Sequence, residues 1–274
     1  MSRIAVIIVT HDSEAVIGRC VAALEKQAGP PVSVIVVDSG SRDQDYLRVF
    51  GDRPRFEVLE AGNVGFSRAN NLGYQHLAAD VEYVVFLNPD VFVEPDTLLQ
   101  AVRVMDREPL AACLTGRLLG FADGSGEPTG RLDSTGIFRK WYGRWYDRGQ
   151  GEEDRGQYGE CEYVPAACGA FMFCRKAALD QAGPATGQVF DADFFLYKED
   201  IELSLRLRKK GWRIVYHPGV RAFHCRGWLA GRRRVPYKLR RMSARNEVVL
   251  YRKHPSIYMG WALFKCGLVT LFRI

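Results

Sequence analysis

Short apolar runs alternate with amphipathic stretches through the first third of the chain. Residues 4–9 and 32–37 are continuous apolar runs rich in β-branched side chains, which is typical of buried strands. Residues 13–27 between them have helical spacing, so the three segments predict a βαβ unit with a right-handed crossover. The alternation continues with a strand over 55–60, a helix over 67–78 and a strand over 83–87. The pattern predicts an α/β fold with a Rossmann-like, mostly parallel central sheet and helices on both faces.

The second half of the chain is less regular. Residues 119–160 are glycine-rich and polar, although two Trp-Tyr pairs are embedded in them, and we interpret this stretch as a long loop over a pocket. The apolar run 163–174 returns to the core. Residues 200–210 have helical spacing that ends at Gly211, and residues 213–216 predict another strand.

Polar clusters stand at the carboxyl ends of three predicted strands. They are Thr10-His11-Asp12, Asp38-Ser39-Gly40-Ser41 and Asn88-Pro89-Asp90. Parallel sheets of this kind bind ligands in the crevice beyond the carboxyl ends of their strands, so the clusters predict one shared site.

Two of the polar segments suit parts of a nucleotide. Asp38 offers a carboxylate to the imide of a uracil or thymine ring or to a ribose hydroxyl. The alternative is that Asp38 and Ser39 cap a helix N-terminus, a position that favours both residue types. The glycine-containing loop 62–66 runs into a helix whose N-terminus favours an anion, which makes Arg68 a candidate phosphate ligand. An ordinary capped turn is the alternative for this loop.

Asp90 follows an apolar strand and is a candidate ligand for Mg²⁺ or Mn²⁺. A carboxylate there can hold the cation while a diphosphate fills other coordination positions, and the cation neutralises charge on a departing diphosphate. His224 is a candidate further ligand, because neutral imidazole binds Mn²⁺, whereas we interpret His217 as structural. The alternative for Asn88-Pro89-Asp90 is a simple turn.

Glu199 and Asp200 begin the predicted helix over 200–210. Carboxylates at a helix start are often only dipole-stabilised caps. In a pocket, one of them can act as the general base that takes a proton from an acceptor hydroxyl. The apolar segment 194–197 beside them is expected to raise the pKa of such a base by desolvation.

Five motifs together resemble the family 2 glycosyltransferases, and within that family the rhamnosyltransferase-like branch. In chain order they are Val9-Thr-His-Asp-Ser13, Val37-Asp-Ser-Gly-Ser-Arg-Asp43, Gly62-Asn-Val-Gly-Phe66, Leu87-Asn-Pro-Asp90 and Tyr197-Lys-Glu-Asp200. The likeness covers residues 3–225. Two positions depart from the family pattern: His11 and Asp12 stand in place of the usual Tyr-Asn, and Asn88 replaces the first acid of an Asp-x-Asp metal motif.

The resemblance implies a GT-A fold and an inverting transfer from a UDP- or dTDP-sugar with Mg²⁺ or Mn²⁺. It assigns base binding to Asp38, metal binding to Asp90 and the role of catalytic base to Asp200. His224 stays a candidate further metal ligand, and Glu199 a candidate catalytic residue, on the chemistry of their side chains. The full set of candidate nucleotide-binding residues is Thr10, Asp12, Asp38, Ser39, Gly65, Arg68, Asn70 and Asn88. The expected acceptor is a glycan or a lipid-linked saccharide, and the sugar of the rhamnosyltransferase-like branch is L-rhamnose.

Positive charge is concentrated towards the C-terminus. Residues 201–254 hold 16 Lys and Arg against two acids, a net +14, so that the total of +6 leaves −8 for the remainder. We expect a GT-A catalytic domain over 1–230 and a basic, aromatic helical segment over 231–274 that attaches to an anionic membrane surface. Packing of 257–274 as a core helix, or a solvated basic face, is the alternative. Acidic clusters at the strand ends argue against a nucleic-acid partner.

Other classes of protein fit the sequence less well. Nucleotidyltransferases and dinucleotide-dependent dehydrogenases would carry a glycine-rich loop after the first strand, where this chain has Thr10-His11-Asp12. A non-catalytic nucleotide-sugar or nucleic-acid binding protein is the alternative function. The seven cysteines form no C-x-x-C pair, and no cleavable signal or spanning segment is predicted, so we expect a cytoplasmic location, peripheral to the inner face of the membrane.

Overall fold

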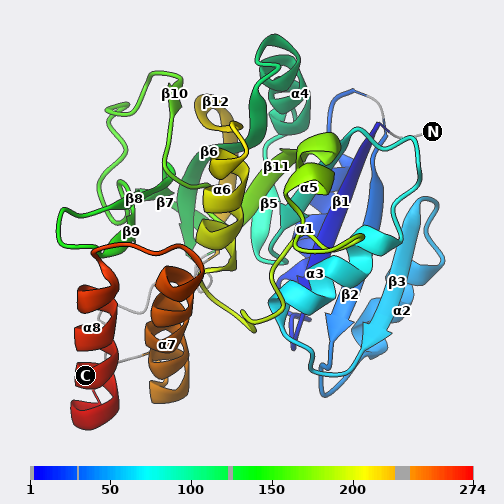
Figure 1. Cartoon of the computed structure of the whole chain (residues 1–274). Helices are drawn as coiled ribbons and strands as arrows, with labels where there is room; N and C mark the ends of the chain where they lie inside the picture. The colour runs from blue at the N-terminus through cyan, green and yellow to red at the C-terminus, as the bar shows by residue number, and fades with distance from the viewer. Residues whose placement is uncertain (1–2, 30, 123–125, 226–234, 274) are drawn as a thin grey trace.

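A central sheet organises the chain, whose computed structural model describes residues 3–29, 31–122, 126–225 and 235–273. Its strands are β1 (Ile4–Thr10), β2 (Ser33–Ser39), β3 (Phe56–Ala61), β4 (Tyr83–Leu87), β5 (Val91–Val93), β6 (Ala111–Ala122), β7 (Glu127–Ser134), β10 (Glu162–Tyr163), β11 (Phe171–Arg175) and β12 (Arg213–His224). The main path through the sheet is β10-β12-β6-β11-β4-β1-β2-β3 (Figure 1).

The first half of the chain builds the parallel part of this sheet. β1 pairs in parallel with β2 and β4, and β2 with β3. β6 and β12 are also parallel to each other, while β11 between β4 and β6 is antiparallel to both. The mostly parallel α/β sheet predicted from the sequence is therefore confirmed.

Helices cover both faces of the sheet. They are α1 (Ile17–Glu25), a short 3₁₀ turn (Asp45–Leu47), α2 (Arg48–Gly51), α3 (Phe66–Gln75), α4 (Thr97–Arg107), α5 (Lys176–Ala182), α6 (Glu199–Lys209), α7 (Tyr237–Lys253) and α8 (Met259–Phe272). Alternate side chains of β1 enter two separate cores. Ile4, Val6 and Ile8 pack with α1 and α4, whereas Ala5, Ile7 and Val9 pack with α3, α5 and α6.

The long loop expected over residues 119–160 is wrong. Four strands lie in this stretch instead: β6 continues to Ala122, β7 pairs back onto β6, and β8 (Ile137–Arg139) pairs with β9 (Trp145–Asp147). Glycines at positive φ, among them Gly136 and Gly143, form the turns between these short strands. The glycines gave the stretch a loop-like composition, and strands of three residues are too short to show an alternating pattern.

The two C-terminal helices form an antiparallel pair beside the sheet (Figure 1). The Tyr237 hydroxyl at the start of α7 donates to the Thr270 carbonyl near the end of α8, and Lys265 of α8 pairs with the buried Glu247 of α7. The pair is also joined to the rest of the chain, since the Tyr251 hydroxyl donates to the Gly143 carbonyl at 3.1 Å. Among the residues that the structure describes, every helix is too short or too polar to cross a lipid bilayer.

Candidate functional site

The carboxyl ends of β1, β2 and β4 meet at one edge of the sheet, as the polar clusters predicted. A cavity of about 520 Å³ opens there, which we call the strand-end cavity. Six of the candidate residues line it: Thr10, Asp12, Ser39, Gly65, Asn88 and Asp90. Phe195, Lys238 and Met242 complete the opposite wall. Residues from four of the five motifs thus come together at the predicted place.

Asp38 is fully buried beneath the turn that follows β2. Its carboxylate accepts hydrogen bonds from the Thr10 hydroxyl, the Gly40 and Ser41 backbone N–H groups, the Ser41 hydroxyl and the Gln44 amide. Burial pushes the pKa of Asp38 upward, but these hydrogen bonds outweigh burial and hold the pKa below its ordinary value. The arrangement favours a role for Asp38 in shaping the turn at the cavity, while direct binding of a base stays a prediction.

Gly65 is fixed by its surroundings as well as by its backbone. Its φ is +81°, and the Ser39 hydroxyl accepts its N–H at 3.1 Å. A Cβ at this position would lie 2.5 Å from the Phe195 ring and 2.6 Å from the Phe195 carbonyl oxygen. Only glycine lets the α3 loop approach Phe195 this closely at the cavity wall.

Two predicted nucleotide ligands lie elsewhere in the structure. Arg68 is exposed and lines a separate surface hollow beside Val64 and Leu72. Asn70 is buried, and its side-chain amide donates to the Phe66 carbonyl within α3. Neither is among the described residues that line the strand-end cavity, so their contact with a nucleotide remains a prediction.

His224 lies between two carboxylates at the end of β12. Its Nδ1 is 2.7 Å from Asp133 Oδ2, and its Nε2 is 3.4 Å from Asp90 Oδ2. Burial alone would lower the pKa of His224, but hydrogen bonds with Asp133 and Asp90 raise it to about 9. Asp133 thereby fixes the ring and directs Nε2 towards Asp90, an arrangement typical of carboxylate-supported metal histidines.

Asp90 and His224 suit a divalent cation that shares its coordination with a ligand. Two acceptor-capable atoms, Asp90 Oδ2 and His224 Nε2, face each other and need either a proton or a cation between them. Among the described residues no group of three or more His, Cys, Asp or Glu side chains is arranged to hold a metal. A cation at Asp90 would therefore need further oxygen ligands from a bound molecule such as a diphosphate.

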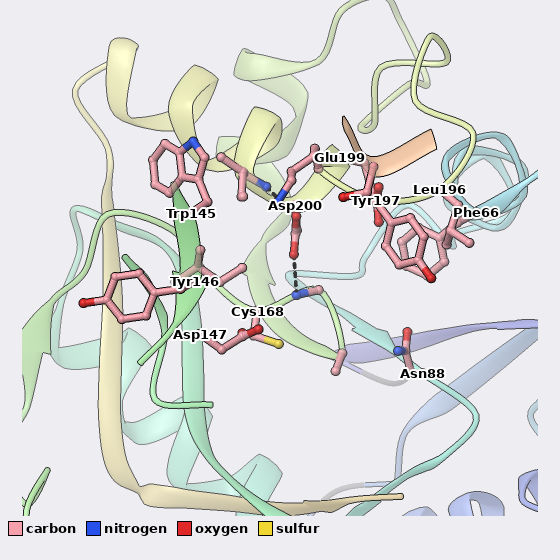
Figure 2. A pocket seen from close by; sticks show the side chains of 16 residues that line it. Phe66, Asn88, Trp145, Tyr146, Asp147, Cys168, Leu196, Tyr197, Glu199 and Asp200 are labelled. Carbon is pink, nitrogen blue, oxygen red and sulfur yellow. Dashed lines mark hydrogen bonds between the residues drawn. The ribbon is translucent and has the colours of Figure 1, made fainter. Parts of the chain in front are cut away.

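A second cavity, of about 210 Å³, lies beside the first and contains the other candidate acids. Asp147, Glu199 and Asp200 line it, and we call it the carboxylate cavity. Figure 2 shows Trp145 and Tyr146 on one side and Phe66 and Leu196 on the other, with Asp200 between them. Asn88, Phe66 and Leu196 line both cavities, so the two cavities are adjacent.

The charge of the Glu199–Asp200 pair belongs on Asp200. Its two carboxylate oxygens accept hydrogen bonds from the backbone N–H groups of Ile201 and Gly169, at 2.8 and 3.0 Å (Figure 2). Glu199 is buried, and its Oε2 has no hydrogen-bond partner among the described residues. Desolvation and the neighbouring Asp200 charge raise the pKa of Glu199 to about 8. Desolvation also raises the pKa of Asp200, which suits a base that must take up a proton.

We expect Glu199→Gln to flatten the pH dependence of stability. The ordinary pKa of Glu is 4.5 and that of folded Glu199 is about 8. Its contribution to stability is thus complete below pH 4.5 and is lost as the pH rises towards 8, because the ionised form is penalised only in the folded protein. Urea unfolding between about pH 5 and about pH 9 measures this slope. An exposed control, Glu60→Gln, should keep the wild-type slope, and an unchanged slope in Glu199→Gln would contradict the burial argument.

The helix carrying these acids begins from an unusual backbone conformation. Tyr197 and Lys198 have φ of +75° and +76°, values that non-glycine residues rarely adopt. The Asn246 amide of α7 donates to the carbonyls of both Leu196 and Tyr197, each at 2.9 Å. Asn246 thus holds the turn that sets the start of α6 and the position of Asp200.

Sequence reasoning missed several residues of the site. Asp133, Trp145 and Asp147 lie in the stretch that was interpreted as a loop, and Asn246 lies in the basic C-terminal segment. The embedded Trp-Tyr pairs were the available signal for the β9 wall of the carboxylate cavity. For Asp133 and Asn246 the sequence carries no such signal, because their partners are 91 and 50 residues away.

Comparison with known proteins gives matches over most of the chain. The family model described as Glycosyl transferase family 2 matches residues 5–183. N-acetylglucosaminyl-diphospho-decaprenol L-rhamnosyltransferase of Mycobacterium tuberculosis (strain ATCC 25618 / H37Rv) is 29% identical over 244 residues, 83% of this chain and 77% of that protein. Rhamnosyltransferase WbbL of Escherichia coli (strain K12) is 24% identical over 195 residues, 61% of this chain and 63% of that protein.

Solved structures match the fold as well. GalNAc-T7 with UDP, GalNAc and Mn²⁺ aligns with a TM-score of 0.70 and 16% identity over 91% of this chain, which spans 47% of that one. The mannosyltransferase PcManGT from Pyrobaculum calidifontis, in complex with GDP-Man and Mn²⁺, aligns with a TM-score of 0.60 and 17% identity over 98% of this chain and 70% of that one. At these identities the likeness shows the fold, and it confirms the GT-A-type α/β fold predicted from the sequence.

Proposed function

This chain belongs to glycosyl transferase family 2, and we propose that it transfers a sugar, with inversion, from a UDP- or dTDP-sugar to a hydroxyl group of a glycan or lipid-linked saccharide. One observation carries the proposal: the strand-end cavity and the carboxylate cavity share Asn88, Phe66 and Leu196 as common walls. A donor in the first cavity would present its anomeric carbon to an acceptor in the second.

The strand-end cavity would hold the nucleotide diphosphate. The turn organised by Asp38 and the Gly65 loop line the side where the nucleoside would lie. Asp90 and His224 would hold Mg²⁺ or Mn²⁺, which neutralises the charge that develops on a departing diphosphate. Lys238 adds a positive charge on the opposite wall, where it supports binding of an anionic donor.

Asp200 would act as the general base in a single displacement. It accepts the proton from the acceptor hydroxyl while that oxygen bonds to the anomeric carbon and the bond from this carbon to the diphosphate breaks. The backbone N–H groups of Gly169 and Ile201 orient the carboxylate. Trp145 and Tyr146 supply aromatic surface against which a saccharide ring can pack.

The relatives support a more specific acceptor and donor. The mycobacterial relative is named for transfer of L-rhamnose to a diphospho-decaprenol carrying N-acetylglucosamine. We extend this to the present chain and infer an L-rhamnosyl donor and a lipid-linked saccharide acceptor, with the enzyme at the cytoplasmic surface of a membrane.

A turnover assay with purified full-length protein tests the proposed function. dTDP-L-rhamnose and a panel of UDP-sugars would be supplied with Mn²⁺ and a short-chain polyprenyl-diphosphate saccharide. We expect acceptor-dependent release of the nucleoside diphosphate and an anomerically inverted product, identified by NMR. Tight donor binding without any release of nucleoside diphosphate would instead favour a non-catalytic nucleotide-sugar binding protein.

A further inference from the structure

The outward face of α8 is mostly apolar, with Thr270 as its exposed polar residue. Leu263, Phe264 and Leu271 lie on this face and are 56%, 58% and 77% exposed, and Gly260 and Gly267 complete the stripe. The opposite side of the helix, with Ala262 and Val269, is buried against the protein. A surface helix normally turns polar residues outward, so the mostly apolar outer face of α8 indicates that something covers it.

Exposed apolar side chains gather around this helix. Among the described residues, ten large hydrophobic side chains are exposed, and six of them belong to α8 or its immediate surroundings: Trp141, Ile257, Leu263, Phe264, Leu271 and Phe272. Trp141 reaches α8 through ring contacts with Tyr142, which packs on Trp261 at 4.8 Å between centroids. The gathering of six side chains in one region marks an interaction surface, since scattered exposed residues would need no explanation.

The neighbouring helix supplies positive charge. Arg241, Arg245 and Arg252 follow one another along the exposed side of α7 at intervals of four and seven residues, which places them on one face. Arg273 ends α8 over the Tyr237 ring. The described residues of α7 and α8 include one acid, Glu247, which is buried and forms an ion pair with Lys265. The exposed charges on these two helices are therefore cationic and complement an anionic surface.

The dimensions of α8 suit a position in the membrane interface. Its 14 residues extend about 21 Å, less than the roughly 30 Å hydrocarbon core of a bilayer. A short helix with an apolar face and basic neighbours lies in the plane of the interface, with aromatic side chains at the headgroup level. Trp141, which is 85% exposed, is placed for such contacts.

We propose that the outward face of α8, with Trp141, Ile257 and the basic face of α7, docks this protein on the surface of an anionic lipid bilayer. The inference rests on the proposed function, because a lipid-linked acceptor gives the docking its use. The docking face is joined to the carboxylate cavity: Arg139 stacks between Tyr258, just before α8, and Trp145 of the cavity wall, at 4.1 and 5.1 Å. An acceptor carried in the bilayer would thus meet the cavity from the side of α8.

Vesicle flotation tests the docking surface without any turnover. We expect the full-length protein to float with vesicles of phosphatidylglycerol and phosphatidylethanolamine, more weakly at high salt, and weakly with phosphatidylcholine alone. The triple variant Leu263→Ser, Phe264→Ser, Leu271→Ser should lower the lipid partition coefficient by on the order of 100-fold. Arg241→Gln with Arg245→Gln should lower it about tenfold, and with the anionic vesicles only.

The matched control is Val49→Ser with Leu110→Ser, two side chains of similar exposure outside this surface, which should float like wild type. Wild-type protein that stays unbound, or a triple variant that floats normally, would overturn the proposal. So would light scattering that shows wild-type dimers and triple-variant monomers, because a second copy would then cover α8. Turnover of a water-soluble acceptor, expected to persist in the triple variant, reports separately on the proposed function.

Discussion

Replacing Asp200 with asparagine is expected to lower kcat by on the order of 10³-fold while leaving donor affinity within about twofold of wild type. Asparagine keeps the size of the side chain and can still accept a hydrogen bond from the Gly169 N–H, but it cannot take the proton of an acceptor hydroxyl. The loss should therefore appear in the chemical step. Steady-state kinetics, together with calorimetric titration of the donor nucleotide, measures both quantities.

Asp193→Asn is the matched control for this experiment. It lies seven residues earlier in the same segment, its side chain is 67% exposed, and it pairs with Lys253 at the surface. We expect its kcat to match wild type. If Asp200→Asn retains more than about a tenth of wild-type kcat, Asp200 is not the base, and the neighbouring acids Asp147 and Glu199 become the candidates.

Replacing Asp90 with alanine is expected to remove the metal-dependent part of donor binding, a loss of about 100-fold in affinity in the presence of Mn²⁺. The carboxylate is one of two side chains that would hold the cation, and the remaining ligand, His224, would keep only Asp133 as its partner. Wild-type protein in EDTA should show the same weak binding as the variant. Calorimetric titration of UDP and dTDP with and without Mn²⁺ makes the comparison.

Asp96→Ala is the control for the loss of one nearby acidic charge, because Asp96 is exposed at the start of α4. Its nucleotide affinity should respond to Mn²⁺ as wild type does. An Asp90→Ala protein whose nucleotide affinity still increases with Mn²⁺ would show that the cation is held elsewhere.

The parallel half of the sheet could be predicted from sequence because its signals are local. Residues 83–87 form the predicted strand β4 with the predicted bounds, and β1 differs from the expected 4–9 by one residue. Each is a continuous buried run, so burial is visible in the residues themselves. By contrast, β5, α4 and α5 were not predicted, and the expected strand over 213–216 continues to His224 as β12.

The residues of the candidate site also differ in whether a local sequence signal predicts them. That Thr10, Ser39, Asn88 and Asp90 line one cavity could be predicted, because parallel topology brings strand ends together whatever the details of packing. The contact of Asp133 with His224 depends instead on where β7 lies, and that of Asn246 with Tyr197 on where α7 packs. Residues whose only role is to hold a distant partner leave no local pattern in a single sequence.

The hydrogen bonds of Asn246 bear on how this protein can be dissected. A fragment that ends at residue 230, where the composition changes, would keep all strands of the sheet and the full stretch matched by the family model. It would nevertheless lack the amide that restrains the carbonyls of Leu196 and Tyr197, and the left-handed pair ahead of Asp200 would be free to relax. We therefore expect the minimal active unit to extend through α7, so that a truncated protein that still binds nucleotide would be a poor guide to catalysis.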